Sequence, residues 1–329
     1  MGLTREALAK QVGYSFAMMR KIEDDERRPS LHAAELLAKA LEIPQDQQEA
    51  FLRVARQERA VDELGPVDEA GSFPWQTSPP PQTNLPLPTT LFVGRQAELA
   101  RLNDLLENPA CRLVTLVGLA GIGKTRLALQ AARSQRSRFS DGVFFVSLAP
   151  LDSPEMLEGA VANAIGLQFH GAAEHQEQLL RYLDGKHMLL VLDNFEHLIE
   201  RANLVVEMVQ AAPDIQLLVT SREPLNLQGE WVFEVDGLPY PLSPEESSLE
   251  QYEAVQLFLQ SALRASPGFS LNEHNRAWVA RICQLTEGIP LGIELAAPWV
   301  RVLSCGEIAR EIERSLDFLK VSARDIPER

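Results

Sequence analysis

Two parts of the chain differ in how their apolar residues are spaced. In residues 1–60 the apolar positions recur every three or four residues, which is the spacing of one face of an α-helix. After residue 89, short apolar runs alternate with amphipathic helical stretches. The runs are Arg112–Val117, Val143–Leu148, His187–Leu192, Ile215–Thr220 and Trp231–Val235. Strands that alternate with helices predict a parallel sheet with helices on both faces.

The strand pattern does not return after about residue 244. The later apolar positions predict faces of successive helices at Ala254–Phe258, Trp278–Ile282 and Leu295–Leu303. The predicted architecture is therefore multi-domain: a small all-α module, then an α/β domain, then a helical domain. The expected boundaries are 1–60 for the small module, 61–89 for a linker, 90–243 for the α/β domain and 244–329 for the helical domain.

The linker is predicted from proline content. Seven of the 21 prolines lie between Leu64 and Thr90, and such a stretch favours extended, semi-rigid chain that cannot hold a helix. The alternative is an ordered strap that packs on the larger domain, anchored by Phe73 and Trp75.

Composition narrows the functional classes. The chain has 31 basic and 46 acidic residues and a formal net charge of −15, which argues against a protein that coats nucleic acid by bulk electrostatics. Its three cysteines form no CxxC pair, so a disulfide scaffold and a cysteine-ligated zinc site are not expected. The apolar runs are far shorter than the roughly 18 residues of a membrane span. We expect a cytoplasmic protein with no membrane partner.

One apolar run leads directly into a phosphate-binding motif. Gly118–Thr125 has the pattern G-x-x-x-x-G-K-[ST], preceded by a strand and followed by a helical pattern, which is the context the motif requires. Glycines let backbone N–H groups surround phosphate oxygens, and the helix directs its positive end at them. Lys124 is expected to bind the β- and γ-phosphates, and the Thr125 hydroxyl to bind Mg²⁺.

A second run ends in an acidic residue suited to the same metal. Asp193 follows the strand His187–Leu192, about 70 residues after the phosphate loop, where nucleotide hydrolases place a metal-binding carboxylate. Asn194 stands where many ATPases have a second carboxylate that activates water. Either Glu196 takes that role or hydrolysis is slow.

A third strand end carries a basic residue. Arg222 follows the strand Ile215–Thr220, beside the expected nucleotide crevice. An arginine in this place can sense the γ-phosphate in cis; the alternative is a solvated loop arginine. Lys124, Asp193, Glu196 and Arg222 are thus the candidate catalytic residues.

These elements, in this order, resemble the STAND class of signalling ATPases, specifically its NB-ARC group. Residues 90–95 look like the family's motif that touches adenine and ribose, and residues 288–297 resemble its GLPLA motif, whose proline packs against adenine. The expected nucleotide contacts are then Val93, Gly94, Arg95, Gly118, Gly121, Ile122, Gly123, Lys124, Thr125, Arg126 and Pro290.

The resemblance also implies how such a protein works. It implies that the strand ending near Arg222 lies between the strands that lead to the phosphate loop and to Asp193. It implies a helical domain that closes on the nucleotide, ADP and ATP as ligands with Mg²⁺, and an ATP state that self-associates. Slow ATP hydrolysis then serves as a switch between two domain arrangements.

The N-terminal pattern resembles a Cro/repressor-type (XRE-like) helix-turn-helix. Helical stretches at Leu3–Ala9 and Phe16–Glu23 flank a turn with Gly13, and a third helix is expected from Pro29. In such modules the second helix enters the major groove of DNA. The resemblance gives Phe16, Ala17, Met18, Arg20 and Lys21 as groove-facing candidates, with Arg27 and Arg28 at the phosphates.

Charge leaves the partner of this module open. Residues 1–56 contain nine basic and nine acidic side chains, whereas a DNA-binding domain normally has a positive face. The module therefore binds DNA through a local basic patch, or it contacts protein. Met1 falls where the first helix of the resembled family should end, so that helix is expected to be missing, and the family continues past Arg329 into a winged helix and sensor repeats. A shortened or truncated gene product is expected.

Three functions follow in order of preference. The first is a nucleotide-switched, DNA-binding transcriptional regulator. The second is an effector or defence ATPase whose N-terminal module binds protein. The third is a truncated remnant that binds nucleotide without signalling.

Overall fold

The computed structural model describes residues 29, 31–40, 52, 82–171, 173–243, 246, 248–315 and 318–319. The chain separates into two compact units, residues 1–78 and 79–329. In the first unit, helix α3 covers Leu31–Ala40 and buries Leu37 and Ala38. This is the third helix that the sequence predicts for the N-terminal module.

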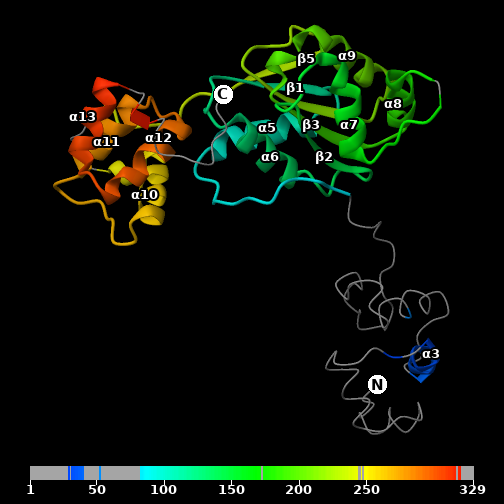
Figure 1. Ribbon diagram of the computed structural model, residues 1–329, viewed down its shortest axis with the longest axis horizontal. Helices are drawn as coiled ribbons and strands as arrows, with labels where there is room; N and C mark the ends of the chain where they lie inside the picture. Colours follow the sequence, from blue (N-terminus) through cyan, green and yellow to red (C-terminus); the bar gives the residue numbers. More distant parts are fainter. Residues whose placement is uncertain are drawn as a thin grey trace. The chain divides into compact units, whose positions relative to one another are not determined.

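The second unit contains a sheet of five parallel strands (Figure 1). Each strand begins and ends within one residue of a predicted apolar run. The order β2-β3-β4-β1-β5 places β4 between β1 and β3, as the family resemblance implies. The strands are β1 (Leu113–Val117), β2 (Gly142–Ser147), β3 (Met188–Asp193), β4 (Gln216–Ser221) and β5 (Glu230–Glu234).

Helices cover both faces of this sheet, as predicted. Successive side chains of a strand point to opposite faces, so Val114 and Leu116 of β1 pack in one core with α5 and α6, whereas Leu113 packs in the other with α7, α8 and α9. Figure 1 shows these two helical layers around the strands. Their bounds are α5 (Gln96–Glu107), α6 (Lys124–Ser134), α7 (Leu157–Ile165), α8 (His175–Leu183) and α9 (Ala202–Ala211), with 3₁₀ turns η2 (Pro154–Met156), η3 (Phe195–His197) and η4 (Ile199–Arg201).

A separate helical domain follows the sheet and has its own apolar core. One predicted helix is wrong in extent: the apolar positions of Leu295–Leu303 do not share one α-helix. The α-helix α12 ends at Ala296, and a 3₁₀ turn that contains Pro298 follows, because proline disfavours helical continuation at the residues before it. The elements are η5 (Leu249–Gln251), α10 (Glu253–Ala265), α11 (Arg276–Leu285), α12 (Pro290–Ala296), η6 (Ala297–Arg301) and α13 (Cys305–Arg314).

The last residues of the predicted linker belong to the sheet domain. Thr83 forms an isolated parallel bridge with Val143 of β2, and the Asn84 side chain bonds to both backbone groups of Phe145. Arg133 of α6 donates to the Pro86 carbonyl. This part of the predicted linker, residues 82–89, thus forms an ordered strap at the β2 edge. Extended, proline-rich chain is equally suited to an edge strand.

No helix among the described residues is long and apolar enough to cross a bilayer.

Candidate nucleotide-binding site

The phosphate loop joins β1 to α6 at the carboxyl end of the sheet. Its backbone turns through positive φ at Gly121 (76°) and Gly123 (97°), a conformation that favours glycine. A Cβ on Gly121 would lie 2.8 Å from Cβ of Leu291 in α12. The first turn of α6 contains no acidic residue, and the positive end of a helix dipole suits an anion.

Lys124 lies over this loop. Its side chain is buried, and Nζ donates to the carbonyls of Gly118 (2.8 Å) and Leu119 (3.0 Å). The ammonium group is therefore held against the backbone of the loop. If a phosphate bound there, the Lys124 ammonium group would exchange its neutral carbonyl partners for a charged one, to which it makes a stronger hydrogen bond.

Thr125 and Asp193 meet as the sequence predicts for a metal site. The Thr125 hydroxyl donates to Asp193 Oδ1 at 2.6 Å, and Asp193 is 5% exposed at the end of β3. Hydroxyl and carboxylate oxygens are ligands that Mg²⁺ accepts beside phosphates. The residues present fit the ion.

A third residue at this point was missed by the sequence analysis. Thr220, buried in β4, donates its hydroxyl to Asp193 Oδ1 (2.7 Å) and accepts the backbone N–H of Asn194 (2.9 Å). Asn194 has φ of 66°, which is uncommon for a residue other than glycine. Thr220 thus fixes both the carboxylate and the turn after it. Its position directly before Ser221-Arg222 was the available signal.

Glu196 and Arg222 contact each other. Arg222 Nε donates to Glu196 Oε1 at 3.0 Å, across the loops that follow β4 and β3. The arginine side chain is 53% exposed and that of the glutamate 18%. The structure therefore brings the proposed water-activating carboxylate and the proposed γ-phosphate sensor together as an ion pair.

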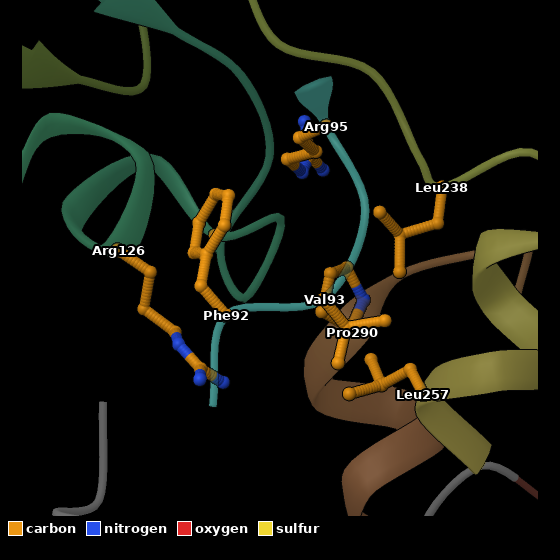
Figure 2. A pocket seen from close by; sticks show the side chains of 8 residues that line it. Phe92, Val93, Arg95, Arg126, Leu238, Leu257 and Pro290 are labelled. Atoms are coloured by element: carbon orange, nitrogen blue, oxygen red, sulfur yellow. The ribbon is translucent and has the colours of Figure 1, made fainter. Parts of the chain in front are cut away.

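A small pocket lies beside the phosphate loop, and Gly123 of the loop belongs to its wall (Figure 2). Its wall combines five of the residues predicted to contact nucleotide with three that were not. The predicted residues are Val93, Arg95, Gly123, Arg126 and Pro290; the others are Phe92, Leu238 and Leu257. Phe92 could have been found, since it stands inside the motif of residues 90–95. Leu238 and Leu257 carry no local signal.

Arg95 is a buried cation that ties three backbone segments together. It is 3% exposed, and Nη2 donates to the carbonyls of Ile122 and Asp236, both at 2.8 Å. Burial lowers the pKa of this guanidinium, against the opposing charges of Glu98 and Glu253. The side chain thus joins the segment before α5, the phosphate loop and the chain that leaves β5.

Arg126, next to Thr125, connects the segment that directly follows the strap with the helical domain. Its Nη1 pairs with Glu294 of α12 at 3.0 Å, and its Nη2 donates to Thr90 Oγ1 (2.7 Å) and to the Leu91 carbonyl (2.9 Å). Close by, Leu291 N–H donates to the Gly121 carbonyl at 3.2 Å. The helical domain is therefore bonded directly to the phosphate loop.

A glycine permits the same domain to approach the chain leaving β5. Gly288 has φ of +66°, and a Cβ on it would lie 2.1 Å from the Leu238 carbonyl oxygen. The Leu238 N–H donates to the Gly288 carbonyl at 2.8 Å. Gly288 therefore brings the segment of Pro290 to the pocket wall.

The candidate DNA contacts lie outside the described residues. These are Phe16, Ala17, Met18, Arg20, Lys21, Arg27 and Arg28.

Two known domain families match the sequence. Residues 91–220 match the AAA ATPase domain, which covers the phosphate loop, Asp193 and Thr220. Residues 1–45 match the helix-turn-helix family. The chain thus combines a helix-turn-helix module with an α/β domain of the phosphate-loop NTPase fold and a helical region.

Curated relatives are similar over about two thirds of the chain. A Mycobacterium tuberculosis protein, provisionally named as an HTH-type transcriptional regulator, is 41% identical over 219 residues, which cover 66% of this chain and 24% of that protein. Regulatory protein AfsR of Streptomyces griseus is 30% identical over 213 residues, covering 61% and 20%. The chain spans about a quarter of the length of the first relative.

A solved structure with a similar arrangement is a STAND protein with a tetratricopeptide repeat sensor from Pyrococcus horikoshii. It is 19% identical, with a TM-score of 0.46, over 72% of this chain and 34% of that one.

Proposed function

We propose that the chain binds ATP or ADP with Mg²⁺ at the carboxyl edge of the sheet. The observation that carries this proposal is the joint placement of Lys124, Thr125 and Asp193 around the phosphate loop. Lys124 would bind the β- and γ-phosphates, while Thr125 and Asp193 would hold the metal ion. A bound Mg²⁺ neutralises phosphate charge. The base would enter the pocket between Val93 and Pro290.

Hydrolysis at this site is proposed to be slow. Asp193 is followed by an amide, Asn194, and the nearest further carboxylate, Glu196, is paired with Arg222. While Glu196 Oε1 accepts from Arg222, that oxygen is not available to an attacking water. Arg222 would have to leave Glu196 to reach a γ-phosphate, and that exchange would release Glu196 at the same time.

The nucleotide is proposed to control closure of the helical domain and self-association. The Leu291–Gly121 hydrogen bond and the Arg126–Glu294 ion pair both join the phosphate loop region to α12. A ligand shifts a two-state equilibrium only when it binds the two states differently. A γ-phosphate beside Arg126 and the loop is suited to make that difference.

The output is proposed to be DNA binding by residues 1–60, which makes the chain a transcriptional regulator. The helix-turn-helix match and the regulator relatives support this assignment. A neutral module binds DNA weakly alone, but several copies joined by self-association gain effective concentration. The contacts proposed are Arg20 and Lys21 in the groove and Arg27 and Arg28 at phosphates.

The experiment compares nucleotide states of the whole chain on DNA. Genomic fragments retained by the purified protein are titrated by fluorescence anisotropy with ADP and with a non-hydrolysable ATP analogue, at several salt concentrations. We expect tighter binding with the ATP analogue, an affinity that falls with salt, and larger assemblies by light scattering.

Two variants separate the parts of this proposal. The double variant R20A/K21A should lose DNA binding and keep nucleotide binding, whereas K124A should lose the difference between nucleotide states. Equal DNA affinity in both nucleotide states would contradict the switch. Absence of salt-dependent DNA binding would instead favour a module that contacts protein.

A further inference from the structure

Two charged side-chain atoms near the pocket are buried without a hydrogen-bond partner among the described residues. They are Arg95 Nη1 and Glu253 Oε2. Nη1 has only the more distant Glu98 carboxylate, at 3.6 Å. A buried polar atom without a partner is unfavourable unless a ligand or water satisfies it. One atom is a donor and the other an acceptor, so the ligand must offer both.

The Glu253 carboxylate is held in a fixed position. Its Oε1 accepts the backbone N–H of Arg95 at 2.9 Å. A Cβ on Gly94 would lie 2.4 Å from Glu253 Cδ, and Gly94 has φ of +67°. Glycine is therefore required here for both space and conformation. The absence of a side chain on Gly94 lets the carboxylate of α10 lie directly against the segment before α5.

This position borders the pocket. Val93 and Arg95, on either side of Gly94, both line it (Figure 2). So does Leu257, which lies one helical turn after Glu253 on the same face of α10. The Glu253 carboxylate therefore packs against a segment in which Val93 and Arg95 line the pocket, and Arg95 carries the unpartnered donor.

We propose that Glu253 determines base specificity: its Oε2 accepts the exocyclic amino group of a 6-aminopurine, while Arg95 Nη1 donates to a ring nitrogen of the same base. This inference rests on the proposed nucleotide site. Adenine presents an amino donor next to ring-nitrogen acceptors, whereas guanine presents the O6 acceptor at the same place. A carboxylate attracts the first and repels the second. The site is thus selective for adenine nucleotides through a residue of the helical domain.

The first test changes the ligand and leaves the protein intact. Dissociation constants are measured by calorimetry for ADP, for purine riboside diphosphate, which lacks the amino group, and for inosine diphosphate, which has an oxygen in its place. A hydrogen bond to a charged group predicts about a tenfold or larger loss on removing the amino group. Inosine diphosphate should bind more weakly still. Equal binding of ADP and purine riboside diphosphate overturns the proposal.

The second test changes the carboxylate. In Glu253→Gln the amide oxygen can keep the bond to Arg95 N–H, which places an NH₂ group where Oε2 was. The affinity for ADP should fall about tenfold, and ADP and purine riboside diphosphate should then bind equally well. The affinity for inosine diphosphate should rise relative to that for ADP. Equal weakening of all three ligands overturns the proposal, because a purely structural role predicts it.

A matched variant and the unmodified protein separate this proposal from the proposed nucleotide site on which it rests. Glu294→Gln, on α12, also loosens the helical domain but should weaken all three nucleotides equally. If the unmodified chain binds no purine nucleotide, the nucleotide site itself fails. If it binds ADP and inosine diphosphate alike, the site stands and the role of Glu253 is overturned.

Discussion

The two ends of the proposed nucleotide site are built differently. The phosphate end lies along one sheet edge, and its polar side chains are bonded to one another: Asp193 accepts from both Thr125 and Thr220. The base end combines apolar side chains with Arg95 and Arg126 and comes from separate segments, with Val93 before α5, Leu238 after β5 and Pro290 in α12 among its walls. Among the described residues, buried charged atoms without a hydrogen-bond partner occur near both ends: Glu196 Oε2 at the phosphate end, and Arg95 Nη1 and Glu253 Oε2 near the base end.

Because of this difference, we expect affinity to come mainly from the phosphate end and base selection from the base end. A site formed by strand ends of one packed sheet is preorganised, so the phosphate end should supply most of the affinity. The base end exists only while the helical domain is in place. The base end should therefore determine which base is bound, and its occupancy should depend on closure of the helical domain.

The largest expected effect concerns the reactivity of three buried thiols. Burial raises the pKa of Cys111 and Cys305 to about 11 and that of Cys283 to about 12. Since the thiolate is the nucleophile, labelling at pH 8 should be at least about a hundredfold slower than for a free thiol of pKa about 8.5. The rate should keep rising with pH through 10, where a free thiol has reached its plateau.

The same measurement can compare the two regions. Cys111 lies in the core of the sheet domain, while Cys283 and Cys305 lie in that of the helical domain. Saturating nucleotide should slow the labelling of the helical-domain thiols more than that of Cys111, and mass spectrometry of peptides measures each. Equal protection of all three would contradict a separately opening helical domain.

The next effect is on affinity at the phosphate end. Lys124→Ala should weaken ATP and ADP by about a hundredfold or more, because a charge-assisted contact to two phosphates is lost. The matched control is Lys186→Ala, whose ammonium pairs with Asp141 away from the site. Calorimetry measures both. Full nucleotide affinity in Lys124→Ala would contradict the assignment of the phosphate loop as the site that binds the phosphates.

A third test concerns the buried hydroxyl beside Asp193. Thr220→Val leaves the Asn194 N–H and Asp193 Oδ1 without this partner, so the free energy of unfolding should fall by about 1–3 kcal/mol and Mg²⁺-dependent ATP affinity should fall about tenfold. Thr220→Ser should restore both.

Thr115 of β1 provides the control. Its buried hydroxyl has no hydrogen-bond partner among the described residues, so Thr115→Val should leave stability unchanged or increase it. Urea unfolding distinguishes the two valine variants. An equal loss of stability in both would show that side-chain shape, not hydrogen bonding, determines the effect at Thr220.

The smallest effect is expected where the two regions join. Arg126 and Glu294 are 36% and 29% exposed, and such partly exposed pairs contribute little to stability, about 0–1 kcal/mol. Arg126→Gln should therefore leave the unfolding free energy nearly unchanged and raise nucleotide release severalfold, measured by stopped-flow fluorescence. Arg181→Gln, which breaks an exposed pair on α8, should change neither. An unchanged release rate in Arg126→Gln would exclude the pair from closure.

The sequence predicted the phosphate end more fully than the base end, for a physical reason. Phosphate and metal chemistry needs specific residue types at strand ends, so Lys124, Thr125 and Asp193 could be named from local pattern. The base pocket needs only apolar surface, and Leu238 and Leu257 look like any core residues. Contacts such as Glu253 with Arg95 join residues far apart in sequence and become visible only in the fold.

The fold shows the same division. All five strands and their parallel arrangement followed from apolar runs that alternate with helices. The strap at residues 82–89 did not, because proline-rich chain has the same local preference in a linker as in an edge strand. The asparagine at position 84, which bonds to Phe145, was its only specific signal.

The most direct test of the central claim is the nucleotide carried by the purified full chain. The protein is denatured, and the supernatant is analysed by ion-exchange chromatography, before and after incubation with Mg²⁺ and ATP. The account predicts an adenine nucleotide at close to one per chain. A chain that carries no nucleotide and takes up none from an excess of Mg²⁺ and ATP would contradict it.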